Sequence, residues 1–89
     1  FRCKETEKVW HRRFSKKFPA DLQVRARRKL IALHIAASLN DLRRPPSNHL
    51  EALKKDRQGQ WSIRINKQWR VCFVWAEGNA HHVEIVDSP

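Results

Sequence analysis

The chain has few cysteines, few glycines and no long apolar run. Its two cysteines, Cys3 and Cys72, have no close partner in the sequence, so we expect two unpaired thiols in a reducing cytoplasm. Two glycines among 89 residues predict that most of the chain forms regular structure. No segment is apolar for long enough to cross a membrane, and no signal-peptide pattern opens the chain. These absences predict a small cytoplasmic protein that does not associate with a membrane.

Acidic residues are scarce. The chain has 9 of them against 19 lysines and arginines, which gives a formal net charge of +10. Such an excess opposes compaction and implies a polyanionic partner, of which nucleic acid is the usual kind. An acidic protein partner is also compatible with the charge and can coexist with RNA. A membrane surface fits less well, because no basic helix carries the clean apolar face of an interfacial anchor.

The sequence also lacks the common catalytic and metal-binding motifs. It has no phosphate-binding loop, nucleophile elbow, zinc-protease motif or CxxC pair. The five histidines show no metal-ligand spacing, and His81 and His82 are adjacent on a predicted strand, where they would point to opposite faces. We therefore predict no metal site and no cofactor.

A chain of 89 residues is long enough for one domain with one modest core, so residues 1–89 are predicted to form a single domain. The first residue is Phe1 rather than methionine. We therefore expect that native N-terminal residues are missing, and that a short strand is missing with them.

The first half of the chain predicts two helices. Apolar residues recur at three- and four-residue spacing over residues 5–18, and Pro19 would end that helix. A second helix is expected from Ala20 or Asp21, either of which would cap it, to about Ser38. Its apolar stripe consists of Leu22, Ala26, Leu30, Leu33 and Ala37.

The second helix changes character along its length. Its first half is basic and is expected to be exposed, whereas its second half is nearly all apolar and is expected to be buried. His34 is then a core or boundary residue. The basic run is either a solvated face or the place where an acidic partner would dock; it consists of Arg25, Arg27, Arg28 and Lys29.

The second half of the chain predicts short antiparallel strands, at residues 49–53, 61–65, 69–75 and 81–87. Charged or polar turns separate them at residues 54–59, 66–68 and 76–80. Strict alternation of apolar and polar residues identifies the side chains of the core face as Trp61, Ile63, Ile65, Trp69, Val71, Phe73 and Trp75. The fold class is α+β: an N-terminal helical hairpin packed on a small twisted antiparallel sheet.

The core face also fixes the strand register. A three-residue loop at 66–68 places Ile63 opposite Val71, whereas a two-residue loop would break the core face. The same register puts Arg64 directly opposite Arg70, and like charges in that position destabilise a strand pair. Either both guanidiniums splay into water, or the chain holds them for an anionic ligand. For the last strand the rule predicts the pairs Val71–Ile85, Phe73–Val83 and Arg70–Val86.

The non-core face of this sheet would carry a set of groups suited to RNA cleavage. Arg64 and Arg70 can bind phosphate oxygens bidentately, and the turn before them supplies three more cations, Lys54, Lys55 and Arg57. Glu51 is a candidate general base for the 2′-hydroxyl proton, a reaction that needs no metal. The alternative is that Glu51 is a solvated surface residue.

Several segments resemble the HigB-type branch of the RelE superfamily, the toxins of type II toxin–antitoxin modules. The resemblance covers most of the chain and is strongest in the runs His49-Leu50-Glu51-Ala52-Leu53-Lys54, Asp56 to Asn66, Trp69-Arg70-Val71 and Val83 to Asp87. It implies a microbial-ribonuclease-like fold and a metal-independent endoribonuclease that cleaves mRNA on the ribosome and so inhibits translation. It also implies a HigA-type helix-turn-helix antitoxin as partner, and contact with operator DNA only through the toxin–antitoxin complex.

The resemblance assigns roles residue by residue. Glu51 matches a position that holds a glutamate base in some members and a histidine in others, and Lys54 matches a lysine near the scissile phosphate. Arg70 matches the arginine that stabilises the transition state, and Asp87 matches an acidic residue near the end of the last strand. Lys55, Arg57 and Arg64 are then candidate RNA contacts.

One departure concerns the residues after Asp87. Relatives usually have Asp-Tyr-His there, with an aromatic or histidine side chain that takes part in catalysis, whereas this chain has Ser88 and Pro89. Loss of an acid–base group typically costs ~10²–10⁴-fold in rate, so we expect weakened or absent cleavage. The alternative function is a non-catalytic basic module that binds RNA, the ribosome or an antitoxin.

Overall fold

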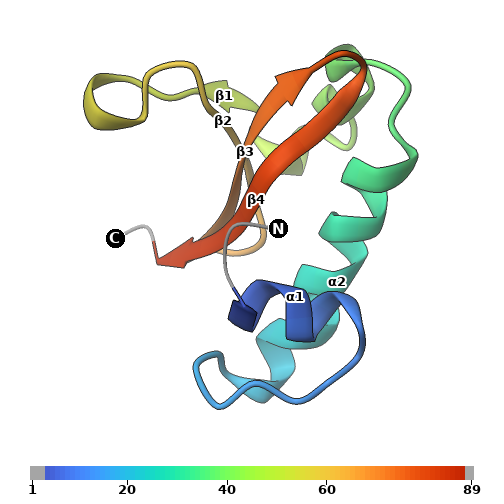
Figure 1. Cartoon of the computed structure of the whole chain (residues 1–89), viewed down its shortest axis with the longest axis vertical. Helices are drawn as coiled ribbons and strands as arrows, with labels where there is room; N and C mark the ends of the chain where they lie inside the picture. The colour runs from blue at the N-terminus through green and yellow to red at the C-terminus, as the bar shows by residue number, and fades with distance from the viewer. Residues whose placement is uncertain (1–3, 88–89) are drawn as a thin grey trace.

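In the computed structural model, which describes residues 4–87, two helices pack on one side of a four-stranded antiparallel sheet (Figure 1). The helices are α1 (Lys4–Trp10) and α2 (Ala20–Ile35). The strands follow one another in the order of the chain as β1 (Glu51–Ala52), β2 (Trp61–Arg64), β3 (Trp69–Ala76) and β4 (Asn79–Asp87). Short 3₁₀ segments lie between α2 and β2 at Leu39–Arg43, Pro46–Asn48 and Lys55–Arg57. The predicted α+β class is confirmed.

The first helix is much shorter than predicted. The expectation of a helix over residues 5–18 is wrong, because α1 ends at Trp10 in a left-handed turn at Arg12, whose φ is 61°. The amide of Arg13 bonds to the carbonyl of Lys8, and the amide of Arg12 bonds to that of Val9, a pattern that closes a helix end. Ser15, which lies in the loop that follows, is fully buried.

The second helix matches its predicted start but ends earlier, at Ile35. The carboxylate of Asp41 accepts hydrogen bonds from the amides of Ala37 and Ser38, so the chain turns away instead of continuing the helix. Neither Ala20 nor Asp21 caps the helix, because Pro19 occupies the N-cap position without a side-chain bond.

Four of the five stripe residues are buried as predicted, namely Leu22, Ala26, Leu30 and Leu33. Ala37 is exposed because it lies beyond the helix end. The expected change from an exposed first half to a buried second half is wrong, since the buried positions run along the whole helix and Ile35 is 73% exposed. His34 is exposed rather than in the core, and its ring lies 5.3 Å from that of Trp10.

The register of the central strand pair is as predicted. Ile63 lies opposite Val71, and Arg64 lies opposite Arg70, across the loop at residues 66–68. Two of the predicted partners on the last strand are also confirmed, since Val71 pairs with Ile85 and Arg70 pairs with Val86. The first strand is shorter than expected, because only Glu51–Ala52 of residues 49–53 forms a ladder.

The hairpin between β3 and β4 differs from the prediction. Its turn is two residues long rather than five, and both Glu77 and Gly78 have positive φ values, of 53° and 76°. This is the backbone that a tight two-residue hairpin requires. Farther along β4, the register shifts by one residue between Cys72 and Val74, and His82 has a φ of 52° at that bulge. The predicted direct pair of Phe73 with Val83 is therefore replaced by the irregularity.

The core lies between the helices and one face of the sheet. It is formed by buried side chains from both layers: Val9, Phe18, Leu22, Ala26, Leu30, Leu33, Leu42, Ile63, Ile65, Val71, Phe73, Val83 and Ile85. Tryptophans 61, 69 and 75 from the predicted core face pack around this cluster and are partly buried. The hydroxyl of Thr6 on α1 accepts a hydrogen bond of 3.0 Å from the backbone amide of Ile85 on β4. Because both helices pack against the core face, they leave the opposite face of the sheet uncovered (Figure 1).

Candidate functional site

The sheet face turned away from the helices carries a small polar cluster. Ser62 pairs with Glu51 on one side and with Cys72 on the other, so its side chain shares this face with that of Arg70. Although no helix covers this face, Ser62 and Cys72 are buried, with 0% and 2% of their surface exposed. The Nε of Arg70 donates a hydrogen bond of 2.8 Å to the hydroxyl of Ser62 and so lies across it.

Arg70 is held by three groups at once. Besides Ser62, its Nη2 donates to the backbone carbonyl of His49 at 3.0 Å and lies 3.3 Å from Oε1 of Glu51. Its side chain is only 17% exposed, whereas that of Glu51 is 59% exposed. The guanidinium is therefore fixed in position, while the carboxylate beside it remains open to a ligand.

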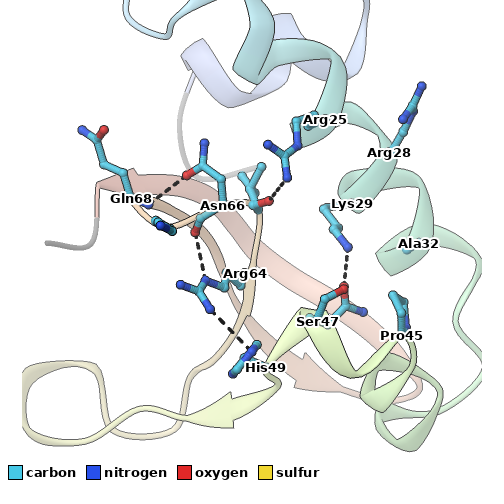
Figure 2. Close-up of a pocket in the computed structure, with 13 residues that line it drawn as sticks. Arg25, Arg28, Lys29, Ala32, Pro45, Ser47, His49, Arg64, Asn66 and Gln68 are labelled. Carbon is cyan, nitrogen blue, oxygen red and sulfur yellow. Dashed lines mark hydrogen bonds between the residues drawn. The ribbon is translucent and has the colours of Figure 1, made fainter.

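Arg64, at the end of β2, also contacts His49, the residue whose carbonyl binds Arg70. Its Nε donates to the carbonyl of Asn66 at 3.1 Å, and its Nη1 lies 3.5 Å from Nε2 of His49 (Figure 2). His49 has a left-handed backbone with a φ of 45°, which turns the chain just before β1. His49 therefore contacts Arg64 through its ring and Arg70 through its carbonyl.

Of the three cations in the turn after β1, two have side chains that are free of partners within the described residues, and the third is paired. Lys54 and Lys55 are exposed, and their side chains make no hydrogen bond or ion pair with any residue of 4–87. Arg57 is engaged, because its Nη1 lies 2.9 Å from Oε1 of Glu84 and 3.2 Å from the side chain of Gln60. The hydrogen bond that Arg57 donates to the carboxylate of Glu84 raises the pKa of Arg57. Glu84 thus offsets part of the charge that Arg57 would offer to RNA.

Asp87 is not brought to the cluster. It lies opposite Trp69 at the end of β4, and alternation along both strands places their side chains on the helix side of the sheet. Its carboxylate accepts a hydrogen bond of 3.1 Å from the side chain of Gln68. Ser88, Pro89 and Cys3 lie outside the described residues. The structure therefore unites Glu51, Arg64 and Arg70 but places Asp87 on the other face.

Two members of the cluster were missed by the sequence analysis. Alternation identifies Ser62 as a polar position on the same face as Arg70, but it does not indicate the hydrogen bond between them. His49 is the first residue of the predicted strand at residues 49–53, and nothing in the sequence indicates the left-handed turn that brings its carbonyl to Arg70. Local turns of this kind depend on tertiary contacts that a single sequence does not show.

The remaining chemistry of the described residues is limited. Cys72 is a free thiol, as predicted, and burial raises its pKa, so it stays protonated and unreactive near neutral pH. Within residues 4–87, no three His, Cys, Asp or Glu side chains come together in a way that would hold a metal ion. In the same part of the chain, every helix is too short or too polar to span a membrane.

Comparison with known proteins points to one family. A family model described as the RelE-like toxin of the type II toxin–antitoxin system HigB matches residues 1–88. Toxin HigB-1 of Vibrio cholerae serotype O1 is 42% identical over 62 residues, which are 70% of this chain and 65% of the relative. The Endoribonuclease HigB of Proteus vulgaris is 33% identical over 69 residues, or 78% of this chain and 74% of the relative.

The name of a third relative gives no function. An uncharacterized protein of Haemophilus influenzae is 36% identical over 67 residues, which are 75% of this chain and 66% of that protein. The match therefore spans slightly less than two thirds of the length of the Vibrio and Haemophilus relatives.

Proposed function

This chain belongs to the HigB-like family of RelE-like toxins from type II toxin–antitoxin systems, and from that membership we propose that it is an endoribonuclease that cleaves mRNA on the ribosome and inhibits translation. The observation that carries the proposal is the placement of Arg70 and Glu51. A guanidinium fixed by three contacts lies 3.3 Å from an exposed carboxylate on an uncovered sheet face. A phosphate and a 2′-hydroxyl can be bound there side by side.

In the proposed reaction, Glu51 takes the proton of the 2′-hydroxyl, and that oxygen attacks the adjacent phosphorus. The P–O5′ bond breaks, and the product retains a 2′,3′-cyclic phosphate. Arg70 stabilises the charge that builds on the non-bridging oxygens, and it costs little reorganisation because it is already held in place. Arg64 neutralises the neighbouring phosphate, and Lys54, Lys55 and Arg57 bind RNA farther along the strand.

The departing 5′-oxygen needs a proton. The family resemblance gives that task to an aromatic or histidine side chain after Asp87, where this chain has Ser88 and Pro89. Among the described residues that contact the cluster, His49 is the one with an imidazole, a side chain that can serve as a general acid. We assign the weaker remaining acid function to His49, and we assign Asp87, on the opposite face, to no step at the phosphate.

The proposed partners follow from the family. An antitoxin would neutralise the protein, and a HigA-type helix-turn-helix antitoxin would carry the complex to operator DNA. The substrate on translating ribosomes places the protein in the cytoplasm. The net charge of +10 supports binding to ribosomal and messenger RNA.

The test is cleavage of mRNA on translating ribosomes by the parent chain, Arg70→Ala and Glu51→Gln, each prepared with the present Ser88-Pro89 and with Tyr-His in their place. We expect cut products from the Tyr-His form, and we expect the Arg70 or Glu51 change to remove them while ribosome binding persists. Lys16→Gln is the control, because Lys16 is an exposed cation outside the cluster. Cleavage that survives both substitutions would refute the assignment.

The Ser88-Pro89 sequence favours a second function, a non-catalytic module that binds RNA or the ribosome through the same face. In that case neither form would cut mRNA, and Arg70→Ala would weaken ribosome association instead. Binding that weakens steeply with salt would identify phosphate contacts, whereas binding that survives high salt would indicate an acidic antitoxin as the only ligand.

A further inference from the structure

A groove of about 970 Å³ lies between α2 and the loop that joins β2 to β3 (Figure 2). One wall is the helix surface around Arg25, Arg28 and Lys29. The other wall is the hairpin loop with Arg64 and Lys67, and residues 45–49 close the lower end. These three segments are far apart in the sequence, so the groove exists only in the folded chain.

The groove concentrates positive charge without a compensating acid. Five of its lining residues are lysines or arginines, and none is an aspartate or glutamate. Three of the five donate to neutral oxygens: Arg25 to the carbonyl of Ile65 at 3.2 Å, Lys29 to the amide oxygen of Asn48, and Arg64 to the carbonyl of Asn66 at 3.1 Å. The side chains of Arg28 and Lys67 make no hydrogen bond or ion pair with any described residue. Burial and the charge of Arg25 lower the pKa of Lys29, an effect that a bound anion would relieve.

The walls of the groove are tied in place before any ligand binds. The bond from Arg25 to Ile65 connects the helix to the hairpin loop. Asn48 is 1% exposed, and its amide nitrogen donates to the carbonyls of Leu42 and Arg44 while its oxygen accepts from Lys29. A ligand therefore meets a preformed site and does not have to order it.

Two residues connect the groove to the polar cluster on the uncovered face of the sheet. Arg64 and His49 both line it, and the carbonyl of His49 also accepts the hydrogen bond from Arg70. We propose that this groove binds the sugar–phosphate backbone of the RNA strand next to the cleaved bond, so that α2 forms part of the RNA-binding surface. This inference rests on the proposed function, because it extends the same site.

The lining favours an RNA backbone over a protein segment. Its apolar members are Ala32, Pro45 and Ile65, which is little surface for a protein interface with an apolar and aromatic centre. It also contains no phenylalanine, tyrosine or tryptophan on which bases would stack. Contacts to phosphate carry no sequence information, so the groove positions the strand and does not select its sequence.

The test compares two variants that lose the same charge. Arg28→Gln with Lys67→Gln removes the two unengaged cations of the groove. Arg13→Gln with Lys16→Gln removes two exposed cations of the loop after α1, which do not line the groove. The probe is a short fluorescent single-stranded RNA of mixed sequence with 2′-O-methyl groups, which cannot be cleaved, and its binding is followed by anisotropy over a range of KCl concentrations.

We expect the groove variant to bind the probe about tenfold more weakly than the control, and its plot of log affinity against log salt to be shallower by about 1.4, as for two phosphate contacts on a single strand. Equal losses in the two variants would overturn the proposal. So would a groove variant that loses affinity for poly-L-glutamate but keeps its affinity for RNA, since the groove would then bind an acidic protein.

Cleavage measurements separate this inference from the proposed function. If the Tyr-His form cuts mRNA and the groove variant cuts it with an unchanged KM, the groove assignment fails while the nuclease assignment stands. If no form cuts RNA but the groove variant selectively loses the probe, the nuclease assignment fails and the groove still binds RNA.

Discussion

Arg64 and Arg70 lie directly opposite each other on adjacent strands, and His49 contacts both of them. The ring of His49 is 3.5 Å from Arg64, and its carbonyl accepts a hydrogen bond of 3.0 Å from Arg70. The two guanidiniums are therefore not released into water, because each is held by separate oxygen acceptors. Within residues 4–87, the one carboxylate that forms an ion pair with either guanidinium is that of Glu51, which lies beside Arg70.

The position of Arg70 depends on the buried hydroxyl of Ser62. In Ser62→Ala the Nε of Arg70 loses its acceptor, and a lost hydrogen bond to a charged group predicts about a tenfold fall in kcat with little change in KM. The fall in rate would be measured by single-turnover mRNA cleavage, in a chain with tyrosine and histidine in place of Ser88 and Pro89. Cys72→Ala is the control, because Cys72 pairs with Ser62 on the same face and is also buried. If both variants show the same kcat, Ser62 has no positioning role.

At positions 88 and 89, the family resemblance implies a catalytic acid. Replacing Ser88 and Pro89 by tyrosine and histidine would supply the acid that the resemblance implies there, and we expect cleavage to rise by ~10²–10⁴-fold. The measurement is mRNA cleavage on translating ribosomes at equal protein concentration. If His49 serves as the remaining acid, His49→Ala will lower cleavage in the present chain more than in the Tyr-His form. Equal, strong cleavage by both forms would contradict the expectation.

Glu5 links acid stability to the loop after α1. The hydroxyl of Ser15 donates to its carboxylate at 2.6 Å, and this bond, with Lys8, lowers the pKa of Glu5. A carboxyl group with a lowered pKa stabilises the fold above its unfolded value near 4.5, and that stability is lost as the pH falls through the lower folded pKa. Glu5→Gln should therefore be less stable than the parent at neutral pH.

The matched control is Glu7→Gln on the same helix, where the carboxylate lies 3.9 Å from His11 on the surface. Urea unfolding from neutral pH down to about pH 3 should bring the midpoints of the parent and Glu5→Gln together as the acid limit is approached. A constant difference between them over the whole range would show that the charge of Glu5 does not contribute.

The tight turn between β3 and β4 requires a left-handed residue at Gly78, with a φ of 76°. A Cβ there would meet no atom within 4 Å, so the cost of substitution is the backbone conformation alone. Gly78→Ala should lower the free energy of unfolding by about 1–2 kcal/mol, measured by urea denaturation. Gly78→Asn should lose less, because asparagine tolerates this conformation. If both variants lose the same free energy of unfolding, the left-handed backbone at position 78 is not the cause of the loss.

The sheet could be predicted from the sequence because alternation leaves few choices. Period two sets the core face, and a shift of one residue would have exposed Ile63 and Val71 while burying Arg64. The same argument predicts the pair of Arg64 with Arg70, which the structure confirms. Alternation does not predict the bulge near His82, because one inserted residue changes the register without changing the composition.

The helices and the groove were harder to predict. The end of α1 depends on a left-handed turn at Arg12, where the usual glycine signal is absent. The basic run on α2 left two interpretations open, a solvated face or a docking surface. Only the fold shows that Arg25 contacts Ile65, forty residues away in the chain, and that its neighbours face the hairpin loop.

The single hydrogen bond from the amide of Ile85 to Thr6 also affects how the molecule meets its copies. A sheet ends in two outer strands, whose free amides and carbonyls can recruit strands from other molecules and start aggregation. Here one outer strand, β1, has only two residues, and on the other, β4, the amide of Ile85 is already bonded by the hydroxyl of Thr6. A foreign strand must displace α1 before it can extend the sheet at that point.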